Sequence, residues 1–250
     1  MKTSNKLLTG FYGLGVLMVL TYLLVARANM VEPTKISRSG NITTMDKSIE
    51  PFTNLRINNR IHVKLIPNIT PFMRVVTDDN LQEHFRLEQD GEHLELSIAD
   101  DIKIANGGKI EVELGVQKLK DLTLSGSSHA RSDSTLQVDF LNMRVHGGAS
   151  VDLAVNAEQI NVSTYGAGQT KLSGTVDFLD ARTMGAAQLK ASDLVADKVI
   201  LDLSGATNAY VYPKQSLTVK ASGASSIRYK GDPQHINKSL NGAAKLKKME

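Results

Sequence analysis

The segment LSGATNA, residues 203–209, has six counterparts in the C-terminal half of the sequence. Each centres on a glycine that is followed by Ala, Ser or Gly and then by another small or hydroxyl residue. The counterparts are LSGSSHA at 124–130, HGGASVD at 146–152, TYGAGQT at 164–170, TMGAAQL at 183–189, ASGASSI at 221–227 and LNGAAKL at 240–246. With Gly126, Gly148, Gly166, Gly185, Gly205, Gly223 and Gly242 as reference positions, the spacings are 22, 18, 19, 20, 18 and 19 residues. A nearly constant spacing of glycines over seven successive units indicates an internal repeat.

Apolar and polar residues alternate between these glycines, as in Leu201-Asp202-Leu203 and Leu217-Thr218-Val219. Alternation with a period of two is typical of half-buried β-strands. A unit of this length is too short for a helix pair, a propeller blade or a βαβ crossover. The repeat therefore predicts a β-solenoid of about seven coils, in which equivalent strands pair in parallel about 4.8 Å apart. Each glycine is expected at a corner that needs positive φ or close approach between coils.

The same alternation occupies a front region, residues 51–115, before the regular coils at 116–245. A hairpin is expected through Asp90-Gly91, and hardly any helix is needed. Together these two parts form one all-β domain over residues 51–245. Residues 31–50 mix Pro, Gly, Ser and charges and are predicted to be a linker, and residues 246–250 are a charged tail.

Residues 1–30 carry an uncharged stretch from Leu7 to Ala26, flanked by Lys2, Lys6 and Arg27. A helix of that length spans about 30 Å, the thickness of a bilayer core, so it predicts a transmembrane signal-anchor. The small residues around Arg27 also fit a signal peptide cleaved after Ala28, which leaves both possibilities open. In either case residues 31–250 are expected outside the cytoplasm.

The formal net charge of +3 comes from this leader, because residues 31–250 hold 26 basic and 26 acidic residues. Phosphate recognition needs basic residues clustered on a surface, so we expect no nucleic-acid partner. The absence of Cys excludes disulfides, thiolate zinc sites, a cysteine nucleophile and a lipoprotein anchor. Oligomeric state cannot be inferred from these features.

Candidate catalytic groups are few and scattered. The pairs Asp78-Asp79 and Asp100-Asp101 lie at turn-like positions where solvated carboxylates are expected. The acids of the coils, at Asp177, Asp180, Asp193, Asp197 and Asp202, form no visible cluster. No Gly-x-Ser-x-Gly elbow is present, and Gly166-Ala167-Gly168 is not followed by the helix of a dinucleotide site. We therefore predict no catalytic and no cofactor-binding residues.

The six histidines do not follow a metal-ligand spacing; they are His62, His84, His93, His129, His146 and His235. His129 and His146 lie near corners of neighbouring coils and are the pair expected to come close. They are interpreted as ordinary surface histidines, and the alternative is that they bind a metal or act as a pH switch. We predict no metal site.

Several motifs together resemble a known family. They are the Ser-Gly-small corners, the preceding Leu-x-Leu strands, FTNLRINNRIHVKL at 52–65 and SIRYKGDP at 226–233. The chain is similar over about residues 50–245 to the putative auto-transporter adhesins with a head GIN domain. The resemblance implies a right-handed parallel β-helix, a bacterial envelope location and adhesion without established catalytic residues. Four corners depart from Ser-Gly, at residues 146–148, 165–166, 184–185 and 241–242, which places a ligand role for the serines in doubt.

Three functions remain open from the sequence. The first is a non-catalytic envelope domain that binds a polysaccharide, an envelope protein or a cell surface through the solenoid. The second is a carbohydrate-active β-helix enzyme, which requires carboxylates on successive coils. The third is a membrane-tethered sensory or scaffolding domain.

Overall fold

The structure is a computed structural model that describes residues 18, 21, 34–68, 70–99, 101–105 and 108–249. It divides into a small unit, residues 1–36 with 100–103, and a large one, residues 37–99 with 104–250. Strands β1 (Thr34–Ile36) and β8 (Ile102–Ile104) form a separate two-stranded sheet. The predicted membrane segment Leu7–Ala26 lies outside the described residues, except for two isolated positions. In the part that is described, no helix is long and apolar enough to cross a bilayer.

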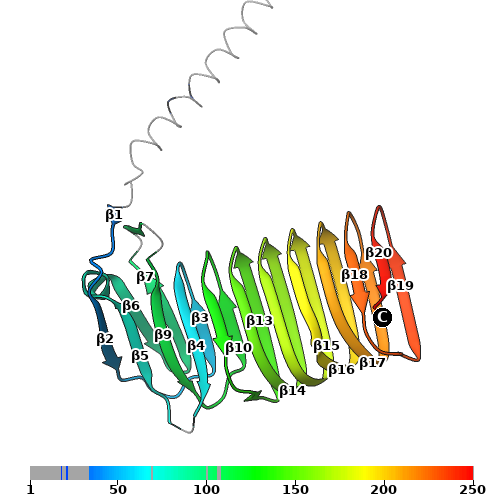
Figure 1. The fold of residues 1–250 in the computed structure, drawn as a ribbon, viewed down its shortest axis with the longest axis horizontal. Helices are drawn as coiled ribbons and strands as arrows, with labels where there is room; N and C mark the ends of the chain where they lie inside the picture. The colour runs from blue at the N-terminus through cyan, green and yellow to red at the C-terminus, as the bar shows by residue number, and fades with distance from the viewer. Residues whose placement is uncertain are drawn as a thin grey trace, which may run out of the picture. The chain divides into compact units, whose positions relative to one another are not determined.

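The large unit is all-β, with a solenoid of about seven turns and one short 3₁₀ helix (Figure 1). The front elements are β2 (Ile42–Lys47), β3 (Asn54–Ile57), β4 (Ile61–Pro67), β5 (Met73–Asp78), η1 (Asp79–His84), β6 (Phe85–Asp90), β7 (His93–Ile98) and β9 (Ile110–Val116). The later strands are β10 (Asp121–Leu124), β11 (His129–Ser132), β12 (Leu136–Gln137), β13 (Phe140–Gly147), β14 (Ser150–Gly166), β15 (Gln169–Gly185), β16 (Gln188–Gly205), β17 (Asn208–Ala221), β18 (Ser226–Tyr229), β19 (His235–Leu240) and β20 (Lys245–Lys248).

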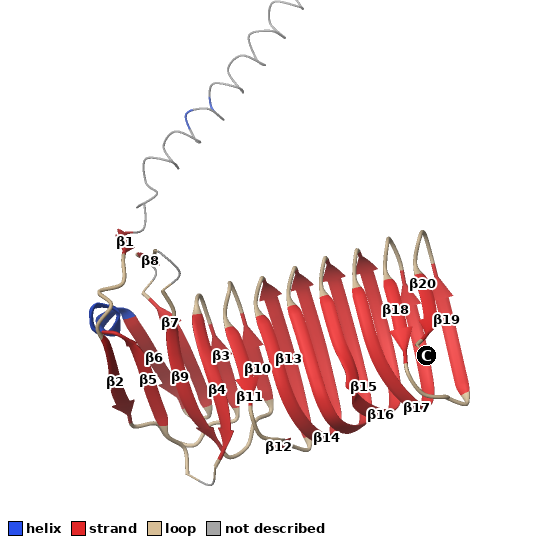
Figure 2. Cartoon of the chain, viewed as in Figure 1, coloured by secondary structure: helices blue, strands red, loops and turns tan. Residues whose placement is uncertain are grey.

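The coils stack by parallel pairing, as the repeat predicts. Strand β15 pairs in parallel with β14 on one side and β16 on the other, and the register runs almost unbroken along both partners. Figure 2 shows these long strands side by side along the solenoid. Each coil has two walls. We call the wall whose strands run up to the corner glycine the pre-corner wall, and the wall whose strands leave that glycine the post-corner wall.

The corner glycines stack directly on one another. Gly185 has φ +111°, and a Cβ atom at this position would lie 2.5 Å from the carbonyl oxygen of Gly166. The sequence pattern predicts Gly148 as the corner of the second unit, and this prediction is wrong. Gly147 has the positive φ, pairs with Gly166 and stacks on Gly126, so the first two spacings become 21 and 19 residues. The backbone of the stacked coils, and not the local Gly-Gly pattern, decides which glycine takes the corner.

The front strands share the same sheet as the regular coils. Strands β3 and β4 form a coil whose corner is Asn59, a non-glycine residue with φ 64° that lies against Gly126. This coil lies between two others, because β3 pairs with β7 and β10 while β4 pairs with β9 and β11. The order of coils in space therefore differs from their order in the sequence. The hairpin through Gly91 is confirmed, since β6 and β7 pair antiparallel around it.

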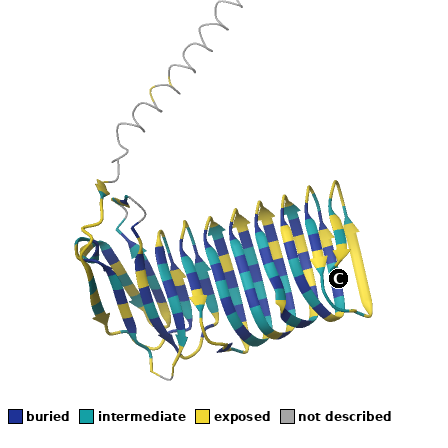
Figure 3. Cartoon of the chain, in the orientation of Figure 1, coloured by how far each residue is buried: buried dark blue, intermediate teal, exposed yellow. Residues whose placement is uncertain are grey.

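The core is a column of aliphatic side chains enclosed by the two walls, and buried residues alternate with more exposed ones along most of the strands (Figure 3). The fourth residue after each corner points inward, and Ala130, Val151, Leu189, Ala209 and Ile227 are all almost fully buried. At the C-terminal end β19 is exposed along most of its length, although it still pairs with β17. Strand β20 pairs with β18 and extends through Lys248 into the segment assigned to the tail.

Candidate functional site

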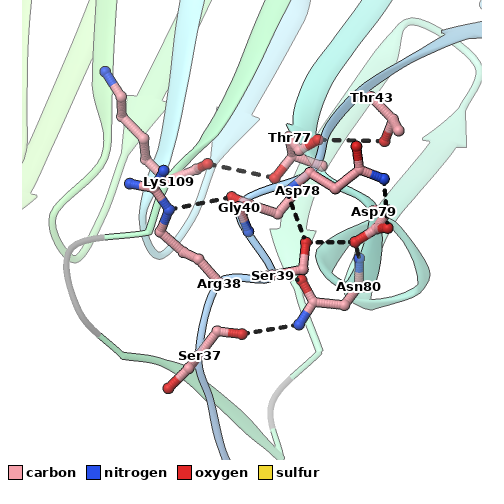
Figure 4. A network of polar contacts seen from close by, with 11 residues as sticks. Ser37, Arg38, Ser39, Gly40, Thr43, Thr77, Asp78, Asp79, Asn80 and Lys109 are labelled. Atoms are coloured by element: carbon pink, nitrogen blue, oxygen red, sulfur yellow. Dashed lines mark hydrogen bonds and ion pairs between the residues drawn. The ribbon is translucent and has the colours of Figure 1, made fainter.

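Asp78 and Asp79 hold the chain that enters the large unit. Asp78 is 4% exposed, its Oδ1 accepts the backbone N–H of Gly40 at 2.8 Å, and its Oδ2 lies 3.4 Å from Nε of Arg38. Asp79 accepts hydrogen bonds from the Ser39 hydroxyl at 2.5 Å and the Asn41 amide at 2.8 Å (Figure 4). These bonds hold the pKa of Asp79 below its usual range. Asp78 and Asp79 were expected to be solvated loop carboxylates. Both instead hold the neighbouring chain in place, and Asp78 is buried.

The remaining candidate acids do not meet. Asp193 pairs with Lys230 at 3.4 Å and Asp197 with Lys214 at 3.6 Å. Asp177 is exposed, whereas Asp180 is half-buried and its Oδ1 has no hydrogen-bond partner among the described residues. Asp101 and Asp202 are exposed, and Asp100 lies outside the described residues.

The structure brings together a different pair of histidines from the one the sequence suggested. His129 lies beside His62, with ring centroids 5.6 Å apart, because β11 pairs directly with β4 of the inserted front coil. His146 instead stacks on Tyr165 at 5.3 Å between centroids, in the neighbouring coil of the pre-corner wall. His129 and His146 therefore belong to different walls. The remaining histidines lie on other elements: His84 ends η1, His93 begins β7 and His235 begins β19.

His62 and His129 line a groove of about 550 Å³ on the post-corner wall of the front coils. Its polar lining also includes Lys64, Lys109, Glu111, Glu113, Ser127, Arg131 and Ser150. Lys109 and Glu111 form an ion pair at 2.6 Å, and His129 Nδ1 lies 2.7 Å from the Ser150 hydroxyl. Among the described residues, no three or more His, Asp or Glu side chains are placed to hold a metal ion. The groove is a polar hollow in which Lys109 pairs with Glu111 and Lys64 lies 3.8 Å from Glu113.

Burial lowers the pKa of both groove histidines. The positive charge of Lys109 also lowers the pKa of His62, while Asp152 opposes the shift at His129. Glu111 has its pKa lowered by the hydrogen bond and charge of Lys109. The imidazoles are therefore held neutral in the folded protein at pH values where exposed histidines begin to protonate.

These shifts predict a pH dependence of stability. Above the ordinary histidine pKa of 6.5 both states are neutral, so the two histidines contribute nothing. Below it the unfolded chain binds protons that the folded chain resists, so stability falls as the pH falls. We expect the melting temperature to drop between about pH 7.5 and 5.5, and to drop less in the His62→Gln, His129→Gln double variant. Equal drops in both proteins would contradict this assignment.

One continuous row of outward side chains crosses the whole post-corner wall. We call it the charge ladder, and strand register defines its members. They are Asp46, Arg74, Glu113, Lys64, Arg131, Asp152, Lys171, Lys190, Tyr210, Arg228 and Lys247, each paired in register with the next. Because side chains alternate between faces, every member points away from the core.

The two halves of the charge ladder differ in charge balance. In the front half acids and bases pair along the row, with Arg74 to Asp46 at 3.0 Å, Arg74 to Glu113 at 3.9 Å and Lys64 to Glu113 at 3.8 Å. The last acid of the row is Asp152, which pairs with Lys171 at 3.0 Å. Beyond it, Lys190, Arg228 and Lys247 form no ion pair with any described residue.

The charge ladder was not predicted above, although the sequence contains a signal for it. Once Asn59 and Gly147 are taken as corners, the fifth residue after each corner is Lys64, Arg131, Asp152, Lys171, Lys190, Tyr210, Arg228 and Lys247 in turn. This five-residue offset is not visible when Gly148 is taken as the corner of its unit and the front coil is left out of the repeat. The front members on β2, β5 and β9 follow no repeat in the sequence and depend on tertiary pairing.

A family model for putative auto-transporter adhesins, head GIN domain, matches residues 51–233. The chain belongs to this family. No curated protein matches the sequence. The family and two of the similar solved proteins carry the description putative adhesin, and another solved protein carries the description putative lipid binding protein.

Solved structures share the head GIN fold. A putative adhesin from Bacteroides fragilis has a TM-score of 0.80 at 22% identity, over 86% of this chain and 100% of that one. A putative lipid binding protein from Parabacteroides distasonis has a TM-score of 0.72 at 20% identity, over 87% of this chain and 100% of that one. A putative adhesin from Parabacteroides merdae has a TM-score of 0.67 at 18% identity, over 86% and 99%. At these identities the likeness shows the fold alone.

Proposed function

We propose that this head GIN protein is a non-catalytic bacterial envelope protein that binds another surface through its solenoid. The observation that carries the proposal is the charge ladder, which offers an unbroken row of polar side chains across the stacked coils. A rigid row of this kind suits an extended ligand better than a small substrate, because its contacts repeat with the coils. Membership of a family of putative adhesins supports the same role.

The proposal includes the location of the chain. The stretch Leu7–Ala26 anchors it in a membrane, or is cleaved after Ala28, and residues 31–250 lie outside the cytoplasm. The Asp78 and Asp79 network then fastens the segment that leads from the linker into the solenoid. We also propose a right-handed coil, because connections between parallel strands of one sheet are right-handed in nearly all proteins.

The second candidate function is a carbohydrate-active enzyme on the same solenoid. It is favoured only by the polar groove around His62 and His129, where Glu111 and Glu113 supply carboxylates. Both carboxylates lie near lysines, Glu111 beside Lys109 and Glu113 beside Lys64. An ion-paired carboxylate with a lowered pKa, as at Glu111, is a poor general acid at neutral pH.

The test uses the full chain in mild detergent, labelled and added to isolated bacterial envelope fragments. We expect saturable binding that excess unlabelled chain displaces and that the heat-unfolded chain does not show. Incubation with polyanionic glycans should leave their chain length unchanged. Absence of saturable binding would overturn the adhesive role, and sustained depolymerisation would establish the enzyme instead.

A further inference from the structure

The half of the charge ladder beyond Asp152 contains basic residues and no acid, and it has the features of a binding track. We call its members from β15 to β20 the basic track, and they are Lys171, Lys190, Tyr210, Arg228 and Lys247. Arg228 and Lys247 are exposed, and Lys190 is half-buried. Isolated cations on a surface are common. Cations that strand register aligns in one row, however, create a positive electrostatic potential along the whole row, and this potential attracts anions.

A second row of polar groups runs beside the basic track, two residues closer to the corner. It consists of Gln169, Gln188, Asn208, Ser226 and Lys245, paired in register from β15 to β20. Lys190 donates to the amide oxygen of Gln169 at 3.4 Å. Within the described part of the chain, Gln188, Asn208 and Ser226 make no side-chain hydrogen bond. Their donors and acceptors are available to a ligand.

We propose that the basic track binds a linear polysaccharide that carries carboxylate groups. This inference rests on the proposed function and names the ligand of the same wall. Successive strands lie about 4.8 Å apart, so the track presents equivalent groups at the regular intervals that a polymer of repeating units needs. The Lys and Arg side chains of the basic track pair with the carboxylates of the polysaccharide. The polar side chains of the second row form hydrogen bonds with its hydroxyl groups.

Tyr210 adds the third element of saccharide recognition. It lies in the middle of the basic track, and the guanidinium of Arg228 lies 5.8 Å from its ring centroid. A half-buried aromatic ring offers an apolar face on which the C–H side of a sugar ring can pack, while its hydroxyl remains polar. Neither row from β15 to β20 contains an aliphatic side chain, so the track lacks the apolar surface that acyl chains require.

The experiment measures binding of the full chain in mild detergent to polygalacturonate, with neutral dextran as the reference. The test variant is Lys190→Gln, Arg228→Gln, Lys247→Gln. The matched control is Lys198→Gln, Lys220→Gln, Lys238→Gln, which removes the same charge from exposed lysines of the pre-corner wall. We expect the test variant to bind about tenfold more weakly and the control to bind like the parent. Added salt should weaken parental binding more than that of the test variant.

Three outcomes would overturn the proposal. The first is equal loss in the test and control variants, which would mean a general effect of net charge. The second is equal binding of polygalacturonate and dextran. The third is tighter binding to vesicles containing anionic lipid, with the same dependence on the track residues, which would identify a membrane surface as the ligand. If binding to envelope fragments survives while polygalacturonate fails, only the ligand class is wrong and the proposed function stands.

Discussion

The Gly205→Val variant is expected to lose about 3–5 kcal/mol of stability, the largest effect of any single substitution considered for this solenoid. Gly205 has φ +97°, a region that costs other L-residues about 1–2 kcal/mol. A Cβ atom there would also lie 2.5 Å from the carbonyl oxygen of Gly185, which belongs to the coil beneath and cannot move alone. Urea unfolding followed by circular dichroism measures the shift of the midpoint.

Gly91→Ala is the control for this prediction. Gly91 also has positive φ, +54°, but nothing lies within 4 Å of the Cβ position. Alanine there meets only the backbone strain, so we expect a loss of about 1–2 kcal/mol. If the two variants lost equal stability, close approach between coils would not be what selects glycine at the corner.

Leu201→Ala is expected to destabilise the protein by about 2–5 kcal/mol. Leu201 is fully buried in β16, and its register partners on the adjacent coils are Ala181 and Val219. Removing its side chain leaves a cavity in the middle of the core column, and the hydrogen-bonded strands on both sides limit how far the walls can close. Thermal and urea unfolding both report this loss.

Ile200→Ala tests the same strand on its other face. Ile200 is 37% exposed on the outside of the pre-corner wall, so truncation removes little buried surface and leaves no cavity. We expect a change below about 1 kcal/mol. A loss at Ile200 as large as that at Leu201 would contradict the inward and outward alternation of β16.

The repeat alone was enough to predict the parallel solenoid and which residues face its core. The small or apolar residues four positions after the corners, among them Ala130 and Leu189, are buried, because one unit of sequence makes one coil. The choice of Gly148 over Gly147 failed for a physical reason. Both glycines can adopt positive φ, and only stacking on Gly126 and Gly166 distinguishes them.

The candidate site was harder to predict than the fold. His62 and His129 are 67 residues apart in the sequence and meet because the coil of β3 and β4 lies between the coils of β7–β9 and β10–β11. No period in the sequence indicates this insertion, since loop closure permits several orders of stacking at similar entropic cost.

The amino-acid pattern was sufficient to predict the all-β class, the coil length and the inward face of the regular strands. These follow from local alternation and from the recurrence of small residues at bends, which act within one unit. The order of the front coils, the choice of Gly147 over Gly148 as a corner and the charges that share one row come only from the folded structure. Those features depend on backbone hydrogen bonds between coils, and it is the register of these bonds that aligns residues from different units.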